Sequence, residues 1–225
     1  MDRREFVTSG VAGVIGVSLT PRLTAQTTPA DVDLLALAES RALKLTNRTA
    51  APVVDGARRG ARVSAAAGEG VALVPNTEFM IGTIEIDLRG KDVPQGSFLG
   101  VAFHGRVNAG YDCVYFRPFN FRAADPASRS HAVQYHSLPD YGWSRLRTEH
   151  PGQYEQAIHP VPDPNDWFHA RLVVRSGKVS VFVNGANDPC LAVSLLGEHK
   201  TGLVGLWVGN NSGGDFANLK ITPAT

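Results

Sequence analysis

Cysteine is nearly absent from this sequence, which has two in 225 residues, Cys113 and Cys190. No Cys-x-x-Cys pair or Cys/His cluster with zinc spacing occurs, which excludes a thiolate zinc site. An oxidising compartment would permit a disulfide between the two, and two separate buried thiols fit the sequence equally well. A chain of this length can bury a hydrophobic core without covalent cross-links.

Excess charge of either sign is also missing. Lys and Arg total 22 against 21 Asp and Glu, a formal net charge of +1. This balance gives no electrostatic basis for binding nucleic acid or an anionic membrane surface. The apolar run at residues 11–19 is far too short to cross a bilayer. We therefore expect no nucleic-acid partner and no membrane anchor.

The amino terminus has the three regions of an export signal in order. A charged start with the pair Arg3-Arg4 and Phe6 is followed by a Gly-rich apolar run, then by small residues before a plausible cut near Ala25. The arginine pair favours a twin-arginine signal peptide over residues 1–26. The alternative is an ordinary secretory signal, or a disordered basic start. We expect the protein to be periplasmic or secreted.

Behind the signal, the chain has the length of one domain. Residues 27–40 contain a short apolar patch and are expected to form an N-terminal arm, which a short helix would suit. From there, to about residue 222, short β-type runs are separated by Gly, Asn, Asp and Pro. This spacing is typical of an all-β sandwich.

Period-two alternation marks the clearest strands. Within 82–88, Ile84, Ile86 and Leu88 share one face. Within 98–104, Leu99, Val101 and Phe103 share a face, and His104 falls on the other. Other strands are expected at 61–65, 71–74, 111–117, 131–136, 168–175, 178–183, 203–208 and 216–222. Together they predict two packed antiparallel sheets, with long loops at 118–130 and 137–167.

Several motifs, in order, resemble the concanavalin A-like lectin/glucanase superfamily. They are EFMIGTIEID at 78–87, YDCVYFR at 111–117, AVQ at 132–134, DWFH at 166–169, VNG at 183–185, GLVGLW at 202–207 and FANLKI at 216–221. Their spacing looks most like the 3-keto-disaccharide hydrolase-like family, and more distantly like laminin G-type modules. The resemblance covers roughly residues 41–222 and implies a two-sheet jelly roll with a concave groove.

The same resemblance points to two groove residues, Arg117 and Gln134. The family typically has a carboxylate two residues before this glutamine, where Ala132 stands here. That departure removes the acid that the family would use for catalysis.

Alternation groups candidate ligand-binding residues on one face of the expected groove. Aromatic rings suit the C–H face of a sugar, and polar side chains suit its hydroxyls. The candidates are Tyr115, Arg117, Gln134, His136 and Trp207, with Trp143 from the long loop. The alternatives are ordinary packing of Tyr115 and Trp207 under that loop, and an ion pair of Arg117 with Asp112 or Asp215.

These residues predict an exported domain that binds a glycan in its concave groove. A glycoside-cleaving hydrolase or lyase, acting on 3-keto-disaccharides, is the enzymatic alternative, in which His136 and Arg117 are the catalytic candidates. The long loop offers three candidate acids for such a reaction, Asp140, Glu149 and Glu155. A laminin G-like protein-interaction module is the third alternative. The sequence leaves open whether the protein is an enzyme.

No cofactor motif occurs. His131 and His136 are five apart in one expected strand, so they should face opposite ways and form no joint metal site. Calcium stays open, because residues 163–166 and 210–211 supply hard oxygen ligands, although without a recognised loop spacing. Glu85 and Asp87 resemble the start of a family 16 glycosidase signature but lack its third acid, and we interpret them as solvent-facing charges.

Overall fold

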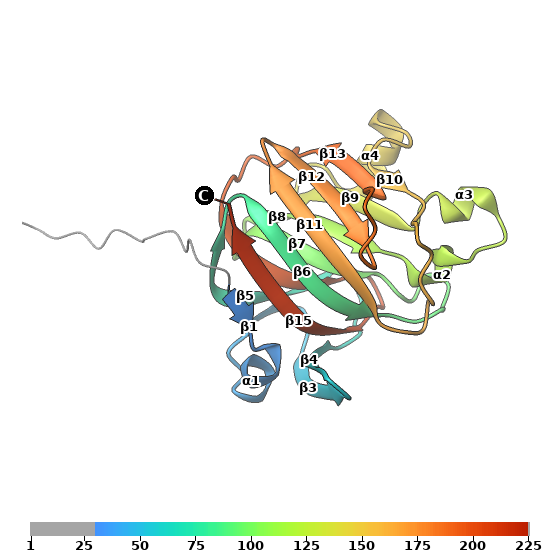
Figure 1. The fold of residues 1–225 in the computed structure, drawn as a ribbon. Coiled ribbons are helices and arrows are strands. Elements are labelled where there is room, and N and C mark those ends of the chain that lie inside the picture. The colour runs from blue at the N-terminus through green and yellow to red at the C-terminus, as the bar shows by residue number, and fades with distance from the viewer. Residues whose placement is uncertain (1–29, 225) are drawn as a thin grey trace, which may run out of the picture.

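The structure, a computed structural model, describes residues 30–224, which form two antiparallel sheets packed face to face (Figure 1). The expected signal peptide at 1–26 lies outside the described residues. Among those that are described, no helix is long and apolar enough to cross a membrane.

One sheet has eight strands and lies in front in Figure 1. Its central strand β15 is long enough to pair with β6 along one edge and with both β4 and β1 along the other. In spatial order its strands are β13 (Leu191–Ser194), β12 (Lys178–Val183), β11 (Phe168–Arg175), β6 (Gly82–Arg89), β15 (Gly214–Pro223), β4 (Arg58–Val63) and β3 (Ala50–Asp55), with β1 (Ala30–Val32) beside β15.

The second sheet has seven strands, all in antiparallel pairs. Its middle strands β8, β7 and β14 carry the aromatic residues described below. The order is β10 (Glu155–Gln156), β9 (Val133–Leu138), β8 (Gly110–Phe116), β7 (Leu99–Arg106), β14 (Gly202–Val208), β5 (Gly70–Phe79) and β2 (Lys44–Thr46). The predicted all-β architecture of two antiparallel sheets is confirmed.

The main core fills the space between the sheets. On β6 the burial alternates residue by residue, and Ile84, Ile86 and Leu88 are fully buried, as their period-two pattern predicts. Phe79, Phe103, Phe116 and Phe168 are among the largest fully buried side chains of this cluster. Because apolar burial scales with area, these rings contribute a large share of the hydrophobic stabilisation.

Four short helices lie outside the sheets. The helix α1 (Leu34–Glu39) begins where Asp33 Oδ1 accepts a hydrogen bond from the backbone N–H of Ala36, at 2.9 Å. Its apolar face, Leu34 and Ala38 included, packs into the main core, so the described part of the N-terminal arm belongs to the sandwich. The others are α2 (Pro118–Phe121), α3 (Pro126–Arg129) and α4 (Trp143–Glu149), all in segments expected to be loops.

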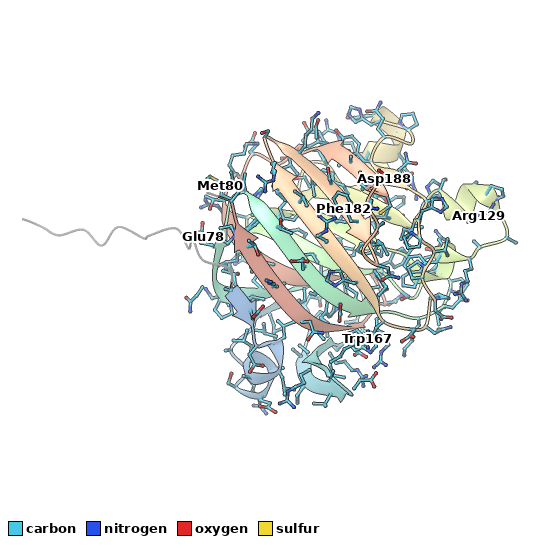
Figure 2. All side chains as sticks on the ribbon, in the orientation of Figure 1. Glu78, Met80, Arg129, Trp167, Phe182 and Asp188 are labelled. Carbon is cyan, nitrogen blue, oxygen red and sulfur yellow. The ribbon has the colours of Figure 1, made fainter. Side chains whose placement is uncertain are left out.

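The outer faces of the two sheets differ. The eight-stranded sheet presents polar side chains outward, and Phe182, labelled in Figure 2, is covered by the guanidinium of Arg171 at 3.9 Å from the ring centroid. Glu85 and Asp87 lie on this face, as interpreted from the sequence. On the seven-stranded sheet, by contrast, strand β7 is buried on both faces. Other side chains of the protein, rather than solvent, therefore cover β7 on that outer face.

Candidate functional site

A second apolar cluster lies on the outer face of the seven-stranded sheet, with Tyr115 and Trp207 at its centre. Their ring centroids are 4.8 Å apart, and the ring of His136 lies 5.2 Å from each. Gly100 pairs with Tyr115 on one side and Trp207 on the other, and a Cβ there would overlap the Val114 carbonyl. The missing side chain is what lets these strands approach so closely.

These rings line a pocket of about 440 Å³, called here the aromatic pocket. Its wall also includes Phe98, Trp143, Arg117, Arg147, Glu69 and the loop 209–211. The structure thus brings together five of the six predicted ligand-binding residues at the pocket, and the sixth, Gln134, lies against Tyr115 and Arg117. Their role in binding remains a prediction.

A buried hydrogen-bond network fixes the polar end of the pocket. Tyr115 donates its hydroxyl hydrogen to Gln134 Oε1 at 2.7 Å, and Arg117 Nη2 donates to the Tyr115 oxygen at 2.7 Å. Arg117 Nη2 also donates to Gln134 Oε1, which settles which end of the amide faces the arginine. The guanidinium carbon lies 4.9 Å from the Tyr115 ring centroid, so the arginine also stacks on that ring.

Two buried side chains, His136 in the pocket lining and Gln134 beside it, have polar atoms without partners. Neither ring nitrogen of His136, nor Nε2 of Gln134, has a hydrogen-bond partner among residues 30–224, although both side chains are at most 1% exposed. Burial, reinforced by the positive charge of Arg117, lowers the pKa of His136 to about 3. The imidazole is therefore neutral at physiological pH, with one donor and one acceptor nitrogen.

This neutral histidine should make the fold sensitive to mild acid. Since the unfolded chain takes up the His136 proton near pH 6.5 and the folded chain near 3, the free energy of unfolding should fall as pH drops between these values. The slope should approach about 1.4 kcal/mol per pH unit for one proton. Urea unfolding between pH 4.5 and 6.5, a window chosen to avoid most carboxylate titration, measures it.

In that window His136→Gln should flatten the slope, whereas the same change at the exposed His159 should leave it intact. Equal slopes in wild type and His136→Gln would contradict the assignment.

Glu69 and Arg147 line the pocket although the sequence did not reveal either of them. Burial raises the pKa of the Glu69 carboxyl group, and Tyr111 donates to Oε2 of that group at 3.3 Å. Tyr111 in turn accepts a hydrogen bond from Trp207 Nε1 at 3.0 Å. Glu69 lies between two glycines in a turn, where no periodicity indicates the direction of its side chain.

Arg48 fastens the two loops that carry the rim of the pocket. Its guanidinium donates to the carbonyls of Gly68 at 2.6 Å and Gly209 at 2.8 Å. Asn210 Oδ1 also accepts from the N–H of Gly68, at 2.7 Å. The loop before β5 and the loop after β14 therefore form one connected rim, which we call the Arg48 latch.

Behind the pocket wall, Glu155 lies against two arginines and a histidine. It accepts hydrogen bonds from Arg147 at 2.8–3.1 Å, and its Oε2 lies 2.8 Å from His131 Nδ1 and 3.8 Å from Arg117 Nη1. It reaches this place because β10 pairs with β9, where Glu155 is opposite Gln134.

One alternative weighed for Arg117, and one expectation for His131, are wrong here. Arg117 forms no ion pair with Asp112, which contacts His104, or with Asp215, which binds Arg62 and Arg89. Strand β9 begins at Val133, so His131 precedes it rather than facing away from His136 within it. The two histidines line the same pocket.

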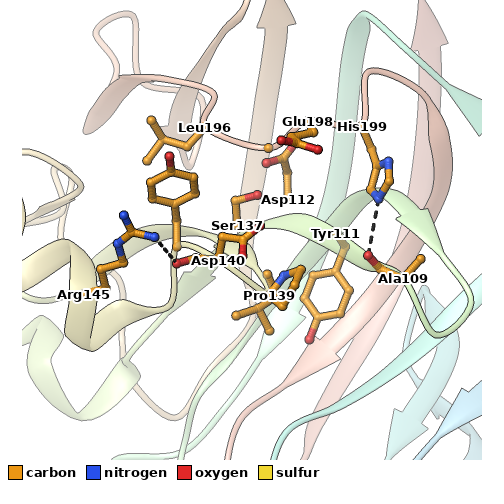
Figure 3. Close-up of a pocket in the computed structure, with 13 residues that line it drawn as sticks. Ala109, Tyr111, Asp112, Ser137, Pro139, Asp140, Arg145, Leu196, Glu198 and His199 are labelled. Atoms are coloured by element: carbon orange, nitrogen blue, oxygen red, sulfur yellow. Dashed lines mark hydrogen bonds between the residues drawn. The ribbon is translucent and has the colours of Figure 1, made fainter.

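A second pocket, of about 470 Å³, lies where β8 begins and β9 ends, beside the loop 196–199 (Figure 3). It contains none of the six predicted binding residues, but it contains Asp140, one of the three acids considered in the long loop. Glu149 is paired on the surface with Arg145, at 2.9 Å. Asp140, Glu149 and Glu155 thus occupy three different environments rather than one site.

Asp112 lies at the inner wall of this second pocket and anchors a buried network. Its Oδ2 is 2.8 Å from His104 Nδ1, and its Oδ1 accepts from the Tyr135 hydroxyl at 2.5 Å. His104 was expected on the opposite face from Phe103, yet it contacts the core. A positive φ of 53° at His104 and a β-bulge between Phe103 and Arg106 redirect its side chain.

The oxygen atoms at 163–166 that the sequence suggested as calcium ligands accept hydrogen bonds from the protein, and calcium binding there stays a prediction. Asp163 Oδ2 accepts from Arg122 and Oδ1 from the N–H of Asn165, while Asp166 Oδ1 accepts from the N–H of Trp167. Across residues 30–224 no group of three or more His, Cys, Asp or Glu side chains is arranged to hold a metal ion. Cys113 and Cys190 are both free thiols.

Comparison with known proteins establishes the fold. No protein-family model and no curated protein matches the sequence. The carbohydrate-binding module CBM66 from Bacillus subtilis superposes with a TM-score of 0.57 at 14% identity, covering 80% of this chain and 94% of the module. A Bacillus subtilis protein of unknown function with a galectin-like fold gives 0.58 at 12% identity, covering 87% and 96%. The predicted two-sheet antiparallel jelly roll is confirmed, and identities this low show the fold alone.

Proposed function

We propose that this protein binds a glycan in the aromatic pocket. The observation that carries the proposal is His136, which lines the pocket beside the aromatic pair and keeps both ring nitrogens unpartnered among the described residues. A sugar hydroxyl both donates and accepts, so it can satisfy either nitrogen of a neutral imidazole. The C–H face of the same ring would stack on an aromatic side chain. The fold shared with a carbohydrate-binding module supports this proposal.

Binding is better supported than glycoside cleavage. Hydrolysis generally uses two carboxyl groups about 5–10 Å apart across the scissile bond. Within the described part of the chain, Glu69 is the one carboxylate that lines the pocket. Elimination needs a competent base, and the pKa of His136, lowered to about 3, makes it a poor one. The proposed location, periplasmic or secreted, rests on residues 1–26 alone.

Isothermal titration against a panel of neutral and acidic glycans tests the proposal. We expect at least one class to bind and to quench tryptophan fluorescence, because Trp207 and Trp143 line the pocket. Absence of binding across the panel would count against it and would favour a protein-interaction role.

Trp143→Ala should weaken glycan binding without unfolding the protein. The side chain is 48% exposed at the mouth of the pocket and stacks with Arg147 at 5.3 Å. Loss of an aromatic contact costs about 1–2 kcal/mol, which is about a 5- to 30-fold increase in Kd. Calorimetry measures the change, and the melting temperature should stay close to wild type because the site is on the surface. Trp143→Phe, which keeps a ring, should bind within about threefold of wild type. Equal losses in both variants would contradict a stacking role.

A further inference from the structure

Arg117 is a nearly buried cation whose hydrogen bonds all go to neutral acceptors. It is 5% exposed, and it donates to the His131 carbonyl, the Tyr115 hydroxyl and the Gln134 amide oxygen. Its contact with Glu155, at 3.8 Å, is too long for a hydrogen bond. Burying a charge without a hydrogen-bonded counter-charge costs free energy that the fold does not require.

Glu155 balances Arg117 only in part, because it is shared with Arg147. Arg147 binds both of its oxygens through Nε and Nη2, and His131 Nδ1 lies 2.8 Å from Oε2. Arg147 Nη1 makes no side-chain hydrogen bond to a described residue, and its side chain is 34% exposed. Burial above all, and with it the charge of Arg147, lowers the pKa of Arg117. Two like charges therefore lie close together in the wall of one pocket.

The carboxylate that lines the pocket, Glu69, lies far from Arg117. Glu69 precedes β5, which is three strand positions from β8, the strand that leads to Arg117. At about 4.8 Å per strand this separation is roughly 14 Å across the sheet. Glu69 also interacts with Arg48 rather than with Arg117 or Arg147. The pocket is thus polarised, with surplus positive charge at the Arg117 end.

We propose that the glycan unit bound in the aromatic pocket carries an anionic oxygen group, a carboxylate or a sulfate, held between Arg117 and Arg147. This inference rests on the proposed glycan binding. Guanidinium groups form strong charge-assisted hydrogen bonds with such groups, and the bound anion would supply the charge that Arg117 lacks.

Matched sugars test the inference. Calorimetry would compare the methyl glycosides of glucose, galactose and mannose with those of the corresponding uronic acids, and glucose 6-sulfate would separate sulfate from carboxylate. At low salt we expect at least one acidic sugar to bind about tenfold or more tighter than its neutral partner, an advantage that should shrink at high salt.

Two arginine variants test whether the preference for acidic sugars arises at Arg147. Arg147→Met should reduce the preference for the acidic sugar to below about threefold. Arg145→Met is the matched control, because it lies on the same helix but lines the second pocket and pairs with Glu149. It should keep the full preference. The salt dependence of the unmodified protein provides a test that does not depend on the folding of any variant.

Three results would overturn the inference. If neutral sugars bind as tightly as acidic ones, the proposal of an anionic group is wrong, while the proposal of glycan binding stands. A preference that survives Arg147→Met would locate the anion elsewhere. Failure of every sugar, neutral and acidic, to bind would overturn glycan binding itself.

Discussion

An Asp112→Ala variant is expected to lose about 2–6 kcal/mol of unfolding free energy, because it leaves two buried polar groups without their partner, at about 1–3 kcal/mol each. His104 Nε2 faces the Met80 carbonyl at 2.8 Å and Nδ1 faces the Asp112 carboxylate, also at 2.8 Å. The Tyr135 hydroxyl donates to the same carboxylate. Alanine would leave His104 Nδ1 and the Tyr135 hydroxyl unpaired. Urea unfolding followed by tryptophan fluorescence measures the loss.

Asp112→Asn is the matched control. Its amide oxygen can accept from Tyr135, and its N–H₂ group can face His104 Nδ1, so each group keeps a partner. We expect a loss below about 1.5 kcal/mol. Similar losses in the two variants would show that the network is not what holds this end of the seven-stranded sheet.

Arg117→Met is expected to have the largest effect on glycan binding, about a 10- to 150-fold increase in Kd. This range corresponds to the loss of a hydrogen bond to a charged group, about 1.5–3 kcal/mol. The fold should tolerate the change, because Tyr115 still donates to Gln134 and Glu155 keeps Arg147. Replacing a buried charge with an apolar chain of similar length is often neutral for stability. Calorimetry and a melting curve on the same sample separate the two effects.

The same substitution on the opposite sheet provides the comparison. Arg171 also stacks on an aromatic ring, that of Phe182, but on the outer face of the eight-stranded sheet. Arg171→Met should leave binding within about twofold, as expected for a surface change away from the site. An Arg117→Met protein that is folded and binds like wild type would exclude this arginine from the site.

Much of the sandwich could be predicted because half-buried strands alternate. The strands β6, β11 and β12 bury every second residue, and this alternation of apolar and polar residues is visible in the sequence. The same alternation placed Tyr115, His136 and Trp207 on one face, since residues two apart in a strand point the same way. The short edge strands β2, β10 and β13 were not predicted, because two to four residues carry too little periodicity.

What the sequence could not show depends on long-range pairing. The bulge that turns His104 into the core arises where β7 meets β8 and β14, and neither partner is visible in a local window. Glu155 reaches the pocket wall only through the register of β10 on β9. Glu69 is brought to the rim by a turn whose position Arg48 fixes from a distant part of the chain.

The Arg48 latch has a kinetic consequence. Because the two rim loops are already fastened to each other, the free energy of ordering them is lost on folding and not on binding. An arriving ligand would meet a rim that needs no rearrangement, so encounter rates should be similar for related sugars. Discrimination among them would then reside in how long each one stays bound.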